Sequence, residues 1–321
     1  MTFTAPSRHR EPIRGFAALL LAAVAVTSSW PWTGVSDRAR AQESRDPRVP
    51  PGRDPGGVPI ALVGPGVDYR IPALAARLAR DGEGEPIGWD FVDNDARPFE
   101  ADRGCVADAC PGAPAADDEA PSPARMLVAE AGASRLIVLK TRDGERGALA
   151  AAIAFAARSP ARIVPALAAT ADGAGPDWML LIEAARRFSN LLFIAPAYGP
   201  PITIEGFDDM SIGNLLVVAP ATAAGGLATA EGTGGPAADV AVPVDAGVGR
   251  GAADPSARRR AELAVVRVAA VAARLLATDP LLDAHAVKVR LLSLAEPAPA
   301  GVPGRVRAGR IAAPETHFRF D

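Results

Sequence analysis

The chain has 321 residues and carries 34 basic against 37 acidic side chains, for a net charge of −3. Its residues are 49% hydrophobic and only 5% aromatic. This balance lacks the basic excess of a nucleic-acid-binding protein, and the apolar content is sufficient for one large buried core.

Residues 1–41 have the features of an export signal. A start with three arginines precedes an unbroken apolar run at 16–26, and Ala39-Arg40-Ala41 offers a cleavage site before Gln42. The run is short for a membrane span, so an uncleaved anchor is the alternative reading. Cleavage would remove five arginines and two acids, leaving a net charge of −6. The mature protein is then expected in the periplasm or outside the cell, with no stable membrane span.

The segment after the signal predicts no regular structure. Residues 42–57 are polar, rich in proline and without any period, which is typical of a disordered leader. Order is expected to begin at Val58. One domain should then cover 58–296, followed by a tail at 297–321 that contains a possible closing strand near Gly309.

From Val58 onward, short apolar runs alternate with helical patterns. Strands are predicted at 58–63, 87–92, 135–139, 162–167, 191–195 and 215–219. Helices are predicted at 71–82, 122–131, 145–157 and 176–188. Strands that are apolar on both faces and separated by helices indicate an α/β fold with a mostly parallel sheet covered on both sides.

Residues 254–277 predict one long helix that belongs inside a large domain. Asp254 can cap it and Pro255 suits its first turn. In its second half the only charges are Arg267 and Arg274, which share one stripe with Arg260. A short turn and a second amphipathic helix follow.

Two stretches of this chain resemble the subtilisin-like serine proteases. In the first, Gly66-Val67-Asp68, Pro72-Ala73-Leu74 and the run from Asp90 to Asp95 match a family segment in order and spacing. In the second, residues 268–295 resemble the two helices that follow the family's catalytic serine. The likeness extends over roughly 58–312. It implies a three-layer subtilisin-like fold, with mostly parallel strands and helices on both faces, and a peptidase domain without a cofactor.

The resemblance fails at the positions that carry the family's chemistry. The family's triad aspartate, histidine and serine fall on Gly64, Arg103 and Glu262, and its oxyanion asparagine falls on Gly199. Two small residues in one wall of the family's substrate cleft are replaced by Leu167 and Ala169.

These replacements remove the means to activate a hydroxyl. A serine nucleophile needs a base, usually a histidine that a carboxylate orients. After the signal, the chain contains only His285, expected on a solvated helix face, and His317, in the polar tail. The sequence therefore predicts an exported pseudoprotease that binds a peptide or protein partner or serves as a scaffold.

Glu262 has two possible roles. It follows Arg258 by four residues and Arg259 by three, a spacing that predicts surface ion pairs on a helix. The alternatives are catalytic: an acid hydrolase that uses Glu262 with Asp68, or a serine endopeptidase with a rearranged active site.

Two further features bear on the site. Cys105 and Cys110 are the only cysteines and are expected to form a small loop disulfide after export; two thiols without a nearby histidine do not predict a metal site. The acids Asp90, Asp93 and Asp95 either bind a cation or form an exposed turn after a strand.

Overall fold

The structure is a computed structural model that describes residues 46–102, 122–173, 175–198, 212–221, 238–244, 257–297 and 306–311. The predicted export signal and both cysteines lie outside these residues, as do Arg103, Gly199 and His317. In the part of the chain that is described, no helix has the length and apolar character needed to cross a bilayer.

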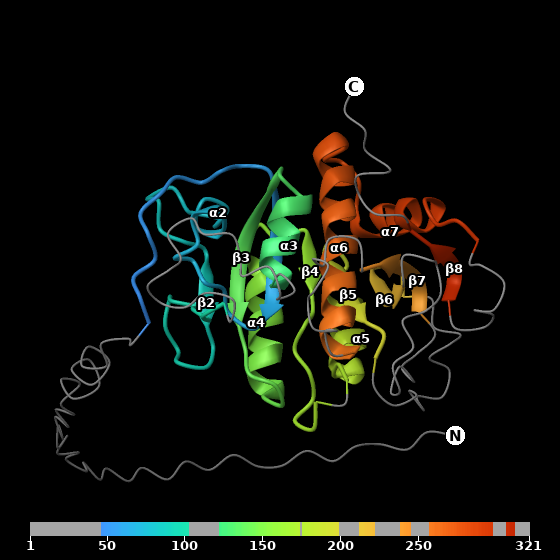
Figure 1. The fold of residues 1–321 in the computed structure, drawn as a ribbon, viewed down its shortest axis with the longest axis horizontal. Coiled ribbons are helices and arrows are strands. Elements are labelled where there is room, and N and C mark those ends of the chain that lie inside the picture. The colour runs from blue at the N-terminus through green and yellow to red at the C-terminus, as the bar shows by residue number, and fades with distance from the viewer. Residues whose placement is uncertain are drawn as a thin grey trace, which may run out of the picture. The chain divides into compact units, whose positions relative to one another are not determined.

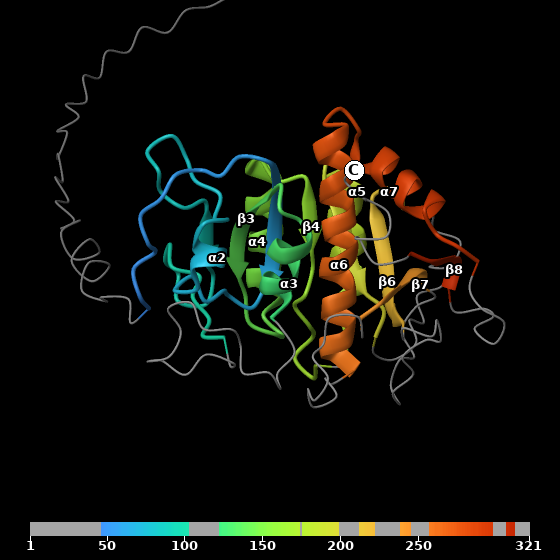
Figure 2. The same ribbon diagram turned by 45° about the horizontal axis from the view of Figure 1, so that its top comes forward.

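The described residues form one eight-stranded parallel sheet in the order β2-β3-β1-β4-β5-β6-β7-β8. Its strands are β1 (Val58–Gly64), β2 (Gly88–Asp90), β3 (Ser134–Lys140), β4 (Ile163–Pro165), β5 (Leu192–Pro196), β6 (Leu215–Ala221), β7 (Ala238–Pro243) and β8 (Val306–Arg310). The helices are α2 (Pro72–Ala75), α3 (Pro123–Glu130), α4 (Arg146–Arg158), α5 (Trp178–Arg187), α6 (Ala257–Thr278) and α7 (Ala284–Ser293). The edge strands are β2 and β8, and Figure 2 shows β8 and α7 far from α2.

Helices cover both faces of the sheet, as the sequence predicts. Ile60 and Leu62 of β1 pack in one apolar cluster with residues of α3 and α6, while Ala61 and Val63 pack in a second cluster with residues of α4 and α5. Figure 1 shows α3 and α6 on one side of the sheet and α4 and α5 on the other. Side chains of a strand alternate between faces, so a strand that is apolar throughout can stabilise both layers.

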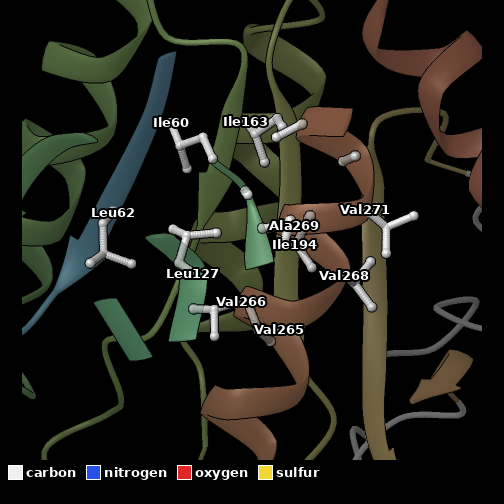
Figure 3. Packing of buried hydrophobic residues seen from close by; sticks show 14 of the residues in the cluster. Ile60, Leu62, Leu127, Ile163, Ile194, Val265, Val266, Val268, Ala269 and Val271 are labelled. Carbon is white, nitrogen blue, oxygen red and sulfur yellow. The ribbon is translucent and has the colours of Figure 1, made fainter. Parts of the chain in front are cut away.

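The long helix α6 is buried along most of its length, as predicted for this helix, while Asp254 and Pro255, its predicted cap and first turn, lie outside the described residues. Every side chain from Ala261 to Ala273 is buried. Figure 3 shows its valines and Ala269 close to Leu127 of α3 and to strand residues such as Ile163 and Ile194. Burying one valine or leucine contributes about 1.5–3 kcal/mol, so this helix is a main source of stability.

One predicted helix is much shorter than expected. Residues 71–82 have a helical pattern, but α2 ends at Ala75. The backbone then runs beside β3: Ala79 N donates to Leu136 O at 2.7 Å, and Leu136 N donates to Arg77 O at 2.6 Å. The strand β2 pairs only with the second half of β3, so residues 77–79 supply hydrogen bonds to its first half. These tertiary bonds outweigh the local helical preference.

The disorder predicted for 42–57 is wrong for residues 46–57, which we call the N-terminal strap. The hydroxyl of Tyr69 donates to Pro47 O at 2.6 Å, and the guanidinium of Arg80 donates to Pro50 O at 2.7 Å. Both side chains are buried in the domain and need hydrogen-bond partners, which the strap supplies. Composition indicates only how much apolar surface a segment can bury on its own. It does not reveal hydrogen-bond partners elsewhere in the chain.

Asp54 ties the strap to the domain. Its carboxylate accepts from Arg80 N and Gly56 N, both at 2.7 Å, and lies 2.8 Å from Nη1 of Arg135. Burial alone would raise the pKa of Asp54, but these donors outweigh burial and hold the pKa below its ordinary value. The ionised carboxylate therefore stabilises the fold.

We expect Asp54→Asn to destabilise the protein by about 1–2 kcal/mol at pH 6, because charge-assisted hydrogen bonds are lost. The folded pKa is lower than the unfolded value of about 3.9, so this contribution is complete above that pH and disappears as the pH falls through the folded pKa. Urea titrations at pH 6 and pH 2.5 measure it. A difference between wild type and Asp54→Asn that stays constant over this range would contradict the assignment.

Candidate functional site at the carboxyl edge of the sheet

Parallel strands all end at one edge of the sheet, and the loops after β1, β3, β4 and β5 leave the sheet there. This carboxyl edge is where open α/β sheets form their sites. The first turns of α6 meet these loops through Arg258, which contacts the loop after β3. The candidate site contains Gly64, Asp143, Leu167, Ala169, Tyr198, Arg258 and Glu262.

Gly64 has no room for the carboxylate that the resemblance would require. Its backbone has a φ of 155°, a positive value that residues with side chains rarely adopt. A Cβ built at Gly64 would lie 2.9 Å from Cβ of Leu167, which is fully buried. Gly64 and Leu167, both of which depart from the family pattern, are therefore packing partners.

Glu262 is held by the two arginines that its spacing predicts. Its Oε1 accepts from Nε of Arg258 at 2.8 Å, and its Oε2 lies 3.5 Å from Nη1 of Arg259. The residue is only 6% exposed, so the predicted partners are found but the predicted surface location of the carboxylate is wrong. A carboxylate that two guanidinium groups neutralise at a buried position has a clear structural role.

Arg258 joins α6 to the loop after β3. Besides Glu262, it binds both oxygens of Asp143, with Nη1 2.5 Å from Oδ2 and Nη2 3.1 Å from Oδ1. Burial would lower the pKa of Arg258, but its hydrogen bonds with Asp143 and Glu262 outweigh burial and raise the pKa above its ordinary value. The guanidinium is therefore a permanent positive charge between two carboxylates.

The loop after β3 lies directly on the segment after β4. Asp143 Oδ1 accepts from Ala169 N at 2.9 Å, and Gly144 N donates to Ala169 O at 2.9 Å. Gly144 has a φ of 80°, and a Cβ there would lie 2.6 Å from Cβ of Ala171. Glycine thus permits both the turn and the close approach. Both backbone groups of Ala169 are occupied by the protein's own chain.

Tyr198, the only tyrosine of the candidate site, lies near the charged side chains of Arg258, Glu262 and Asp143. With Ala169 and Ala261 it forms a small apolar cluster apart from the two large ones. Its hydroxyl is buried and has no hydrogen-bond partner within the described residues. Burial raises the pKa of Tyr198 to about 12, and the positive charge of Arg258 only partly offsets this. The side chain is therefore a neutral phenol at physiological pH.

Asp68 is a second buried carboxylate at this edge. The guanidinium of Arg70 binds both of its oxygens, at 2.8 and 2.6 Å, and Asp102 N donates to it at 3.2 Å. Burial alone would raise the pKa of Asp68, but these donors hold the pKa below its ordinary value. Asp68 and Glu262 bind different arginines, and no described contact brings the two carboxylates together.

His285 lies at the other end of the sheet. Its Nδ1 is 3.2 Å from the carbonyl oxygen of Gly213, which lies two residues before the start of β6 and so belongs to the amino edge. The side chain is exposed near the start of α7, as expected of a solvated helix residue. No other histidine occurs within the described ranges, so these ranges bring no imidazole to the carboxyl edge.

The acids Asp90, Asp93 and Asp95, at and after the end of β2, do not all form an exposed turn. Asp90 is fully buried, and Asp46 and Asp93 gather with it around Nζ of Lys140, which lies 2.8 Å from Asp90 Oδ2 and 3.8 Å from an oxygen of each of the others. Asp95 instead caps the next turn by accepting from Arg97 N. In this structure the ammonium of Lys140 supplies the positive charge that a bound cation would supply.

Sequence reasoning missed Asp143 and Tyr198. Each comes within four residues of the end of a predicted strand, at 135–139 and 191–195, and so must lie at the carboxyl edge of a parallel sheet. That position was the available signal. Their contacts with Arg258 depend on how α6 packs, which strand endings alone do not indicate.

No protein-family model and no curated protein sequence matches this chain. Solved structures do match it. A cold adapted subtilisin-like serine proteinase aligns with a TM-score of 0.52 and 14% identity, over 84% of this chain and 93% of the other. A lanthipeptide protease aligns with a TM-score of 0.51 and 14% identity, over 80% of this chain and 88% of the other. At this level of identity the likeness is evidence for a shared fold.

Proposed function

We propose that this chain, which has a subtilisin-like fold, is an exported pseudoprotease that binds a peptide or protein partner, or serves as a scaffold for one. The observation that carries the proposal is the state of Glu262. It stands where the resemblance puts the nucleophile, and its carboxylate is bound by Arg258 and Arg259. A carboxylate held in this way cannot replace an activated serine.

Two further observations support the absence of catalysis. Gly64 cannot carry a carboxylate without a clash against Leu167, and His285 binds the opposite edge of the sheet. Within the described residues, a hydroxyl at the carboxyl edge would therefore have no imidazole to act as the base that serine catalysis requires.

The site of binding in this proposal is the carboxyl edge around Ala169 and Tyr198. Loops of a parallel sheet converge there, and the buried hydroxyl of Tyr198 is a polar group without a partner in the described chain. The export signal expected at residues 1–41 would place the partner in the periplasm or outside the cell.

Proteolysis is the second candidate, because both solved structures compared above are proteases by name. Arg103 and Gly199, which replace the family's histidine and oxyanion asparagine, would then need substitutes from elsewhere in the chain. An acid hydrolase built on Asp68 and Glu262 has less support, because the lowered pKa of Asp68 makes it a poor proton donor at neutral pH.

We expect the purified mature protein neither to react with a fluorophosphonate probe nor to cleave casein, with an active subtilisin as the positive control. Ser256 lies closest in sequence before Glu262, so Ser256→Ala is the matched variant. Covalent labelling or casein cleavage that disappears in Ser256→Ala would establish the peptidase instead. Labelling that persists in this variant would point to a different serine.

A further inference from the structure

We propose that Asp143, Arg258 and Glu262 form a latch that holds the loop 142–145 closed over the segment 167–169, and that opening this latch regulates access to the site. The inference rests on the proposed function, since it describes how a binding site at this edge would be covered and uncovered. The latch is an intramolecular contact between the loop after β3 and the start of α6.

The closed state is held by few contacts, and they converge on one charge. Asp143 binds Arg258 with both oxygens and uses one of them to accept from Ala169 N as well. Gly144 N adds the bond to Ala169 O. Without Arg258, the loop would keep only hydrogen bonds to one residue of the segment. The guanidinium is therefore the part of the latch that joins it to the rigid helix α6.

Opening the latch would not disturb the main core. The apolar residues beneath it, Ala169, Tyr198 and Ala261, form a cluster apart from the two large clusters. A small pocket is lined by residues of both the loop and the segment, among them Gly144 and Ala169.

The cost of opening is also low. The side chains of Arg258 and Asp143 are 32% and 38% exposed, and partly exposed ion pairs contribute little because water replaces the lost partner. Tyr198 supports the same conclusion: its buried hydroxyl has no hydrogen-bond partner in the described part of the chain, which is a cost that the closed state carries.

Opening would release one N–H and one C=O of Ala169 beside the end of a parallel sheet. Free backbone groups of this kind pair with an extended peptide, whose own N–H and C=O groups complete the bonds. The class of partner that fits is therefore a peptide in extended conformation, and the closed loop competes with it for the same two groups.

Hydrogen exchange of the Gly144 and Ala169 amides tests the latch on the full mature protein. In Arg258→Gln both amides are expected to exchange about fivefold faster, the size expected for loss of a partly exposed ion pair. The amide of Ile137 in β3 should keep its rate. Arg142→Gln is the matched control, because Arg142 lies on the same loop but pairs with the exposed Glu145.

A second variant and a binding measurement complete the test. Asp143→Asn breaks the ion pair from the other side and decides the matter if Arg258→Gln fails to fold by circular dichroism. Fluorescein-labelled β-casein, an unfolded chain, is expected to bind Arg258→Gln severalfold more tightly than wild type. If the two amides exchange faster in Arg258→Gln but the variant does not bind casein, the latch is supported and peptide binding is refuted. Exchange no faster than in Arg142→Gln would overturn the latch.

Discussion

Gly64→Asp is expected to destabilise the domain by about 3 kcal/mol and to restore no proteolysis, although it returns the family's residue to this position. The added Cβ would lie 2.9 Å from Cβ of Leu167, in a backbone conformation with a φ of 155°. Both the clash and the backbone strain arise at Cβ, before any carboxylate is considered. Urea unfolding followed by circular dichroism measures the loss.

The same cause predicts how control variants behave. Gly64→Ala should destabilise nearly as much as Gly64→Asp, because alanine already carries the offending Cβ. Leu167→Gly alone creates a cavity and lowers the free energy of unfolding. In the Gly64→Ala background the same substitution should lower it by less, because removing the Leu167 side chain also removes the clash with the new Cβ. Additive free energies in this double-mutant cycle would show that the two residues do not compete for the same space.

Glu130→Ala is expected to cost about 3–5 kcal/mol, because it leaves Arg267 charged and buried without its carboxylate. Arg267 is only 2% exposed in the middle of α6, and its Nε and Nη2 lie 2.8 and 2.6 Å from Oε1 of Glu130 at the end of α3. The remaining guanidinium nitrogen, Nη1, donates to the carbonyl oxygen of Pro243, a weaker partner for a charge. Thermal and urea unfolding both measure the effect.

Two comparisons separate burial from charge pairing. The double variant Glu130→Leu with Arg267→Met should recover most of the lost stability, since apolar residues of similar size often replace a buried ion pair without penalty. Glu145→Ala, which breaks the exposed pair with Arg142, should change the free energy of unfolding by less than about 0.5 kcal/mol. Equal losses in Glu130→Ala and Glu145→Ala would contradict the role given to burial.

Local patterns were enough to predict most helices and strands. The predicted helices at 122–131, 145–157 and 176–188 correspond to α3, α4 and α5, and each is found within three residues of its predicted bounds. Strands apolar on both faces predicted the covered parallel sheet. These features depend on the order of apolar and polar residues within one segment, so the sequence carries them directly.

Patterns failed where a distant segment supplied the deciding contact. Residues 77–79 leave their helical pattern to pair with β3, and the N-terminal strap is ordered because Tyr69 and Arg80 bind its carbonyl groups. Neither partner can be identified from within the segment itself. A local preference of a few tenths of a kcal/mol per residue is smaller than the cost of an unpaired buried polar group.

The candidate site divides in the same way. The sequence alone determined that glycine and glutamate stand at the positions the resemblance assigns to an aspartate and a serine. Only the tertiary structure decided that Leu167 fills the space beside Gly64, and that Asp143, from a loop more than a hundred residues away in sequence, binds Arg258 next to Glu262. Residue identity is written in the chain, whereas contact between loops depends on parallel register and on the packing of α6 against the sheet. Those arise only when all the strands and helices are assembled together.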